Sequence, residues 1–401
     1  MKSINLSLLF FLLFNLQSFS QDMKEGFTYL ETGKYQKAEV FFNKVLKDHP
    51  TNKTAILCYG RAVGLNGDAP KAVNIFTNLL KDYPDSFEVK LNYAESLLWG
   101  KNYPDAKIYY ETLLKEDDKS FAALLGYANT LSNLKEFENA IINVDKALVV
   151  LPGNNNALVS KKYMRLGLAN KKIKFQEYGD AESILKENLV PFKNDKETLL
   201  NLANLYLISK QTDKAKETYE LIGENPDDKI ASLNGIALSY HIAGDEKTAL
   251  LYSGKALALI NKKTPKTIKN QTIERSIQAL IWSKKFSSAE AEINKLLENN
   301  DDPDNWMYSL RATLNVYRSN FKKSLTDYNL ILKKDSASFD GNLGKANVLK
   351  ALGYYKGAYK SAENTLTFYD EQKDAKNFIK QLDLSYTPVV ETKLSYSFDN
   401  G

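Results

Sequence analysis

Small and aromatic residues recur along this chain at a fixed interval. In residues 33–42, Tyr35, Ala38 and Phe42 stand three and four positions apart, which places them on one face of a helix. The small residue returns along the whole sequence, at Ala38, Ala72, Ala106, Ala140, Ala181, Ala215, Ala249, Ala289, Ser324 and Ala358. The successive spacings are 34, 34, 34, 41, 34, 34, 40, 35 and 34 residues, which indicates an internal repeat.

Each repeat is predicted to form two antiparallel helices. The small residue lies in the second helix where the two helices approach most closely, and a larger side chain there would overpack the contact at a cost of about 1–3 kcal/mol. An aromatic residue three positions earlier fills the space between the helices, at Tyr35, Tyr103, Phe137, Phe286, Phe321 and Tyr355. Pro50, Pro84 and Pro152 end the second helix of three repeats, because proline cannot continue a helix.

The repeat resembles the tetratricopeptide repeat family, whose pattern has a small residue at position eight, an aromatic at eleven, alanine at twenty, an aromatic at twenty-four and proline at thirty-two. The first repeat matches all five, at Gly26, Tyr29, Ala38, Phe42 and Pro50. Later repeats depart from the pattern, with Ser253 replacing the aromatic and Asp118 the proline. The resemblance covers about residues 22–370 and implies an all-α fold, a right-handed α-solenoid of about ten helix pairs with a C-terminal capping helix.

Two longer spacings divide the array into three predicted blocks. Repeats one to four occupy residues 21–153, repeats five to seven occupy 154–262, and repeats eight to ten occupy 263–370. Residues 371–387 are predicted to form the capping helix that covers the apolar face of the last repeat. Each insertion is interpreted as a longer helix or loop, with a bend or hinge between blocks as the alternative.

Residues 1–20 are predicted to be a signal peptide. Lys2 supplies a positive start, residues 6–14 form a nearly uninterrupted apolar run, and Ser18 and Ser20 place small residues before a cleavage site after Ser20. An N-terminal membrane anchor is the alternative, but the apolar run is short for a bilayer span. The protein is therefore expected to be exported to the periplasm.

The pattern changes again in residues 388–401. Val390, Leu394, Tyr396 and Phe398 stand at alternating positions among polar residues, which is the period of a strand. The segment resembles the opening strand that follows a tetratricopeptide array in barrel-bearing exopolysaccharide exporters, and this implies attachment to the outer membrane through a C-terminal β-barrel. A terminal tail, or a strand added to the end of the solenoid, is the alternative.

Charge and composition argue against several classes of protein. The net charge of +5 comes from 54 basic and 49 acidic residues mixed along the chain, whereas a nucleic-acid binder concentrates its basic residues in a stripe. Cys58 is the single cysteine, and His49 and His241 are the two histidines, so neither an intramolecular disulfide nor a Cys/His metal site is expected. Without a catalytic triad, a phosphate loop or an EF-hand, the chain is not expected to be an enzyme or to hold a cofactor.

The first helix of each repeat is expected to line the concave binding surface. Position nine points into this groove in the family and is occupied here, in order, by Phe27, Arg61, Glu95, Asn129, Asn170, Asn204, Leu238, Gln278, Thr313 and Asn347. The four asparagines offer amide donors and acceptors that can hold an extended peptide backbone, which also occurs in some family members. Solvated polar side chains on an exposed face are an equal alternative.

Aromatic residues stand near the rim of this groove at position thirteen. Trp99, Trp282 and Tyr317 can stack on a sugar or a proline, or can pack between repeats instead. The predicted partner-binding residues are Arg61, Glu95, Trp99, Asn129, Asn170, Asn204, Gln278, Trp282 and Asn347. They predict a periplasmic scaffold for a protein or peptide. The alternative function is the periplasmic part of an exopolysaccharide exporter that binds glycan or the synthase machinery.

Overall fold

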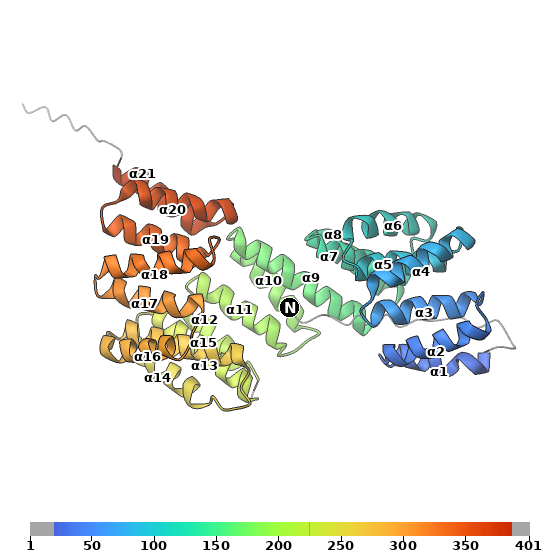
Figure 1. The fold of residues 1–401 in the computed structure, drawn as a ribbon, viewed down its shortest axis with the longest axis horizontal. Coiled ribbons are helices and arrows are strands. Elements are labelled where there is room, and N and C mark those ends of the chain that lie inside the picture. Colours follow the sequence, from blue (N-terminus) through green and yellow to red (C-terminus); the bar gives the residue numbers. More distant parts are fainter. Residues whose placement is uncertain (1–19, 224, 387–401) are drawn as a thin grey trace, which may run out of the picture. The chain divides into compact units, whose positions relative to one another are not determined.

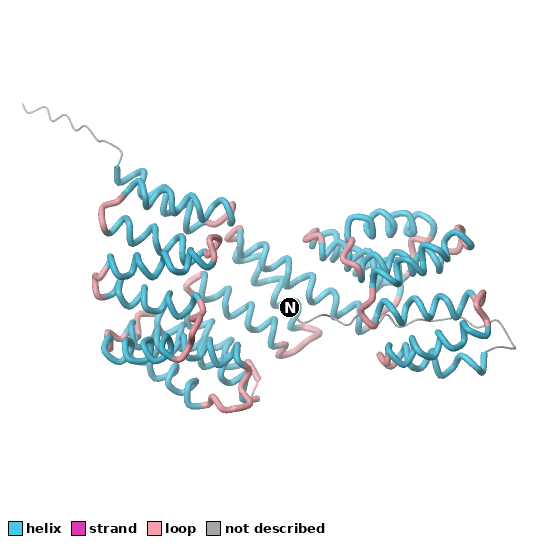
Figure 2. Tube along the Cα trace, viewed as in Figure 1, coloured by secondary structure: helices cyan, strands magenta, loops and turns pink. Residues whose placement is uncertain are grey.

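A computed structural model of the protein describes residues 20–223 and 225–386. All regular structure in these residues is α-helical, in 21 helices (Figure 1, Figure 2). The prediction of an all-α fold is therefore confirmed. The predicted signal peptide, apart from its last residue, and the predicted strand-like tail at residues 388–401 lie outside the described residues.

The helices form ten successive pairs and one final helix, in two compact units. Unit 1 is Met1–Lys193 and unit 2 is Asn194–Gly401. The pairs of unit 1 are α1 Ser20–Glu31 with α2 Tyr35–Asp48, α3 Lys53–Leu65 with α4 Ala69–Asp82, α5 Phe87–Trp99 with α6 Tyr103–Glu116, α7 Phe121–Asn133 with α8 Phe137–Val150, and α9 Asn155–Lys174 with α10 Tyr178–Leu189.

Unit 2 has the same pairwise order and ends with a single helix. Its elements are α11 Lys196–Ile208 with α12 Thr212–Glu220, α13 Pro226–Ile242 with α14 Glu246–Ala258, α15 Lys266–Trp282 with α16 Phe286–Glu298, α17 Asn305–Tyr317 with α18 Phe321–Lys334, α19 Phe339–Ala351 with α20 Tyr355–Phe368, and α21 Lys373–Tyr386. Helix α21 packs on α20 and buries Phe378 and Leu382. The predicted capping helix is therefore confirmed.

The recurring small residue lies at the closest helix contact in every repeat. Its ten representatives, from Ala38 to Ala358, have no exposed surface. Large side chains of the second helices pack around this contact, and Phe42, Phe76 and Tyr110 are also fully buried. This packing confirms the ten predicted helix pairs, and it explains why the position tolerates only alanine and serine in this chain.

Polar side chains fix where many of the helices begin. An N-cap side chain accepts a hydrogen bond from the backbone N–H three residues later at Asn52, Asp68, Ser120, Asn154, Asp195, Asn225, Asp245 and Ser338. Each such cap stabilises its helix by about 1 kcal/mol, because it satisfies an otherwise unpaired backbone donor.

The turn inside each repeat requires a left-handed backbone residue. Gly67 and Gly244 supply it with φ angles of 109° and 84°, but Lys101 and Lys135 occupy the equivalent turns with φ of 60° and 64°. Hydrogen bonds hold the turn in place, as where Asn102 N–H donates to the Leu97 carbonyl at 3.0 Å. The turn geometry that recurs in the repeats is thus set by the way the first helix ends, and glycine is the residue that adopts it with the least strain.

Several helices depart in length from a uniform repeat. The extra residues after the fourth repeat lengthen α9 to 20 residues, compared with 13 in α7. Helix α12 has 9 residues, compared with 14 in α6 and α18, and the helix that follows it is correspondingly long. The predicted division into three blocks stays a prediction. The boundary between the two compact units falls between Lys193 and Asn194.

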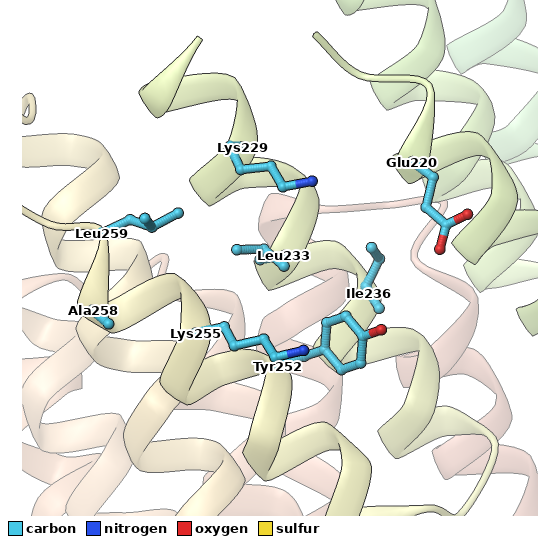
Figure 3. A pocket seen from close by; sticks show the side chains of 8 residues that line it. All are labelled: Glu220, Lys229, Leu233, Ile236, Tyr252, Lys255, Ala258 and Leu259. Carbon is cyan, nitrogen blue, oxygen red and sulfur yellow. The ribbon is translucent and has the colours of Figure 1, made fainter. Parts of the chain in front are cut away.

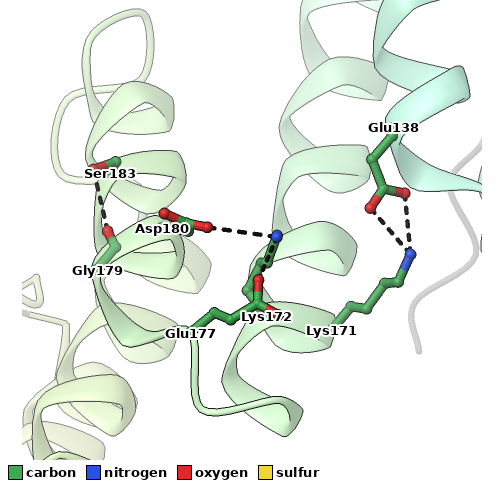
Figure 4. Close-up of polar contacts among 7 residues, drawn as sticks. All are labelled: Glu138, Lys171, Lys172, Glu177, Gly179, Asp180 and Ser183. Atoms are coloured by element: carbon green, nitrogen blue, oxygen red, sulfur yellow. Dashed lines mark hydrogen bonds and ion pairs between the residues drawn. The ribbon is translucent and has the colours of Figure 1, made fainter.

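Exposed charges are paired between neighbouring helices. Lys171 on α9 forms an ion pair with Glu138 on α8 at 3.0 Å, and the next residue, Lys172, pairs with Glu177 and with Asp180 on α10 (Figure 4). Pairs of this kind contribute at most about 1 kcal/mol each, because their side chains are solvated. They account for the interspersed basic and acidic residues of the sequence.

Candidate functional site

The first helices form one layer within each unit. In unit 1, α1, α3, α5, α7 and α9 contact one another in succession, and in unit 2, α11, α13, α15, α17 and α19 do the same. No contact of comparable extent joins successive second helices in the described part of the chain. The predicted site residues Arg61, Glu95, Trp99, Asn129 and Asn170 lie on this layer of unit 1, and Asn204, Gln278, Trp282 and Asn347 lie on that of unit 2.

In unit 1, Arg61 and Glu95 are joined to each other. Arg61 on α3 forms an ion pair with Glu95 on α5 and donates to the Asn92 Oδ1 atom at 2.9 Å. The side chains are 11% and 4% exposed, so the charges neutralise each other in a largely water-free contact. Removing one member of such a pair costs about 3–5 kcal/mol, because the other is left buried and unpaired. Both residues therefore link the second repeat to the third.

Trp99 on α5 packs against α3 beside the same contact. A Cβ atom at Gly64 would lie 2.3 Å from the Trp99 Cε3 atom, so the indole ring rests directly on the backbone of α3. The Arg61 guanidinium lies 5.9 Å from the centre of this ring. Trp99 is therefore held between two repeats and keeps only part of its surface exposed.

Trp282 on α15 is held by different neighbours. The His241 ring of α13 stacks on it with 3.6 Å between ring centres and 2° between planes, and the Arg275 guanidinium lies 5.5 Å from its centre. The Nδ1 atom of His241 lies 2.9 Å from the Glu246 carboxylate, which orients the imidazole. One face of the Trp282 ring is thus already covered by the protein itself.

Arg275 is a residue that sequence reasoning missed. Its Nη1 atom donates to the Gln278 Oε1 atom at 2.8 Å, whereas its buried Nε atom has no hydrogen-bond partner and no ion pair reaches the side chain in the described residues. Burial lowers the pKa of Arg275, and the Glu274 carboxylate opposes this shift. Of the predicted residues, the structure therefore brings Gln278 and Trp282 together with an arginine that keeps its charge.

The four asparagines at position nine have different surroundings. Asn170, Asn204 and Asn347 are exposed, and the Asn129 Nδ2 atom is buried without a hydrogen-bond partner. Asn347 Nδ2 donates to the Leu343 carbonyl at 2.9 Å. The structure therefore does not make them one uniform row, and three of them present amide groups to solvent.

Tyrosine hydroxyls lie beneath position nine in three repeats and were also missed. Tyr110, Tyr219 and Tyr328 belong to second helices, and each ring rests on a glycine of the next first helix, namely Gly126, Gly235 and Gly344. A Cβ atom at these glycines would lie 2.4, 2.3 and 2.4 Å from the ring, so only glycine fits. The sequence signal is a tyrosine followed sixteen residues later by glycine.

The hydroxyl of each tyrosine reaches the first-helix layer. Tyr219 donates to the Asn204 Oδ1 atom at 2.8 Å, and burial raises its pKa to about 12. Burial, and then the Glu95 carboxylate, raises the pKa of Tyr110, whose hydroxyl has no hydrogen-bond partner. Both tyrosines stay neutral at physiological pH, and the Tyr219 hydroxyl is a hydrogen-bond donor to the first-helix layer.

No group of three His, Cys, Asp or Glu side chains that could hold a metal ion occurs in the described residues. Cys58 is buried, and burial raises its pKa to about 12, so the reactive thiolate is not populated at neutral pH. Among the helices at residues 20–223 and 225–386, none is long and apolar enough to cross a membrane.

The fold therefore defines an α-solenoid of paired helices, and family models agree with the repeat. Tetratricopeptide repeat models match residues 23–52, 65–126 and 197–222. The chain thus contains tetratricopeptide repeats in both units, and such a repeat array is a scaffold suited to protein interaction. No curated protein matches the sequence.

Solved structures with similarity to this chain share little sequence with it. A tetratricopeptide repeat protein from Parabacteroides merdae is 18% identical, with 64% of this chain and 100% of that chain covered and a TM-score of 0.40. Yeast Tom70 is 14% identical, with 91% and 96% covered and a TM-score of 0.45. The human IFIT1 dimer is 16% identical, with 90% and 89% covered and a TM-score of 0.42.

Proposed function

We propose that this protein is a scaffold that binds a protein partner on its first-helix layer. The observation that carries the proposal is the ordered pair of Arg275 and Trp282 on that layer of unit 2, where no ion pair among the described residues neutralises the arginine. Arginine and tryptophan dominate the energetics of protein interfaces. Because contacts within the protein already fix these side chains, a partner would order them at little cost in conformational entropy.

The exposed asparagines of other repeats supply hydrogen-bonding groups on the same layer. Asn170, Asn204 and Asn347 are exposed, and the hydrogen-bonding capacity that remains on their amides can pair with backbone N–H and C=O groups of an extended segment. A peptide partner is therefore favoured over a glycan. The glycan alternative relies on stacking against tryptophan, and His241 already covers one face of the Trp282 ring.

Copurification of partners with the tagged full chain tests the proposal. The test variant changes Asn129, Asn170, Asn204 and Asn347 to alanine, and its matched control changes four exposed asparagines of second helices, Asn78, Asn139, Asn294 and Asn364. We expect the first variant to lose partners that the control retains. The same partners in both variants would reject the first-helix layer as the site. Glycan-array binding that Trp282→Ala abolishes would favour the exporter alternative instead.

The site of action is a separate part of the proposal. Export to the periplasm rests on residues 1–20, and outer-membrane attachment rests on residues 388–401. Cell fractionation with N-terminal sequencing tests the first, with a mature chain that begins at Gln21 as the expected result. An intact Met1 in the cytoplasmic fraction would overturn export, and recovery of the mature chain in the soluble periplasmic fraction alone would overturn attachment.

A further inference from the structure

Helices α12, α13 and α14 of unit 2 line a pocket. Its volume is about 540 Å³, and its apolar lining includes Leu233 and Ile236 from α13 and Leu259 after the end of α14 (Figure 3). Leu221 and Leu257 nearby are 57% and 40% exposed. The pocket lies apart from Trp282 and the other position-nine and position-thirteen residues, none of which line it.

The repeat itself explains why the pocket is there. Counting from Ala140 and Ala249, which occupy the same repeat position, pairs Leu124 with Leu233 and Tyr127 with Ile236. The same count pairs Leu114 of α6 with Gly223, three residues beyond the early end of α12. Unit 1 therefore shows what the corresponding space holds when the second helix has its full length.

In unit 1 that space is filled from within. Leu114 and Tyr127 both pack against the cluster that contains Leu124, and the Tyr127 hydroxyl donates to the Glu111 carboxylate at 2.8 Å. In unit 2, the shortened α12 and Gly223 leave out the leucine, and Ile236 is smaller than a tyrosine. The natural complement of the pocket is therefore an aliphatic side chain at the end of a helix, together with a polar group near its rim.

Charged side chains at the rim of the pocket further restrict the kind of ligand that it can bind. Lys229 from α13 and Lys255 from α14 border the pocket together with Glu220 (Figure 3). Neither lysine forms an ion pair in the described chain, and the Lys255 ammonium lies 4.6 Å from the centre of the Tyr252 ring. Two cations against one carboxylate leave a positive rim around an apolar floor, which is complementary to a carboxylate beside an aliphatic side chain.

We propose that this pocket binds a helical segment of a partner protein that inserts a leucine side chain and places an acidic side chain between Lys229 and Lys255. The segment takes the place that Leu114 occupies inside unit 1. None of the residues that line this pocket is a predicted partner-binding residue, so the protein can hold one partner on those residues and a second segment, of the same or a different partner, in the pocket.

A synthetic peptide tests the pocket directly. The probe is a fluorescein-labelled helical peptide of about 14 residues with one leucine flanked by glutamates, titrated with the full chain and followed by fluorescence anisotropy. We expect saturable binding below about 1 mM, and at least tenfold weaker binding when serine replaces the leucine of the probe. No saturable binding up to that concentration, or equal binding of the serine probe, would overturn the proposal.

Unit 1 supplies matched controls for the protein variants. Ala258→Trp fills the pocket at an exposed position and is expected to weaken binding at least tenfold, whereas Val149→Trp at the paired position leaves it unchanged. Lys255→Glu is expected to weaken binding about fivefold, and its counterpart Lys146→Glu is expected to have no effect. Equal binding by wild type and Ala258→Trp would contradict the proposed site.

The pocket proposal and the scaffold proposal can be overturned independently of each other. Trp282→Ala alters the first-helix layer and is expected to leave peptide binding unchanged. If Trp282→Ala abolishes peptide binding while Ala258→Trp does not, the peptide uses the first-helix layer, and the pocket proposal is overturned while the scaffold function stands.

Discussion

Arg61 in unit 1 and Arg275 in unit 2 both lie against a tryptophan on the first-helix layer, but they differ in what neutralises them. Arg61 is held by the Glu95 carboxylate and the Asn92 amide, both almost fully buried. Arg275 is held by the Gln278 amide at 2.8 Å and has no ion pair among the described residues. The same pair of residue types thus makes a structural link in one unit and leaves a charge for a partner in the other.

The largest expected loss of stability comes from removing Arg61, and removing Arg275 is the comparison. Arg61→Met leaves the buried Glu95 carboxylate without its ion-pair partner. This is expected to lower the free energy of unfolding of unit 1 by about 3–5 kcal/mol. Arg275→Met removes a charge with a buried, unpaired Nε atom and is expected to change the stability of unit 2 by less than about 1 kcal/mol. Urea unfolding followed by hydrogen exchange, resolved helix by helix, measures both.

A double variant serves as the control for this prediction. Arg61→Met with Glu95→Leu removes both charges, and most of the lost stability should return because no buried charge is left unpaired. Equal losses in Arg61→Met and Arg275→Met would show that the two arginines have the same role and would remove the distinction between the units.

An intermediate loss of stability is expected from substitutions at the glycine–tyrosine contact that both units contain. Gly126→Ala in unit 1 and Gly235→Ala in unit 2 place a methyl group against the rings of Tyr110 and Tyr219, and each is expected to cost about 1–3 kcal/mol. Gly254→Ala on α14 is the control, since a Cβ atom there meets nothing within 4 Å, and it should stabilise α14 by about 0.5–1 kcal/mol. Thermal unfolding compares the three variants, and a neutral Gly235→Ala would contradict the close contact.

The smallest expected effect depends on pH. Burial raises the pKa of Glu274 above its ordinary value of 4.5, so the folded state favours the protonated carboxyl and is destabilised when Glu274 ionises. Glu274→Gln should therefore stabilise unit 2 at pH 7, by less than about 1 kcal/mol for this partly exposed group, and the gain should vanish as the pH falls through the folded pKa towards 4.5.

The exposed Glu292 on α16 provides the reference for this measurement. Glu292→Gln should leave the unfolding midpoint in urea unchanged at both pH values. A stability gain for Glu274→Gln that persists well below pH 4.5 would show that its ionisation is not the cause.

Much of this architecture could be predicted from the sequence because the same requirement, a small residue at the closest helix contact, recurs in all ten repeats. A buried alanine or serine at one position and helix-breaking residues at the ends specify the pairs locally, so Ala38 predicts its environment as well as Ala358 does. The candidate site was only partly accessible in this way. Arg61 and Gln278 were found from their position in the repeat, whereas Arg275 and His241 were not, because their roles arise from contacts with a neighbouring repeat.

The sequence by itself thus determined the helices, their pairing and the capping helix, since these depend on contacts within about 40 residues that recur with a fixed period. Only the tertiary structure decided which polar residues are available. Whether an arginine is neutralised, as Arg61 is, or a leucine is missing from a packed space, as at Gly223, depends on the side chains that an adjacent helix presents. Small differences in helix length, such as the early end of α12, control that packing without disturbing the repeat pattern.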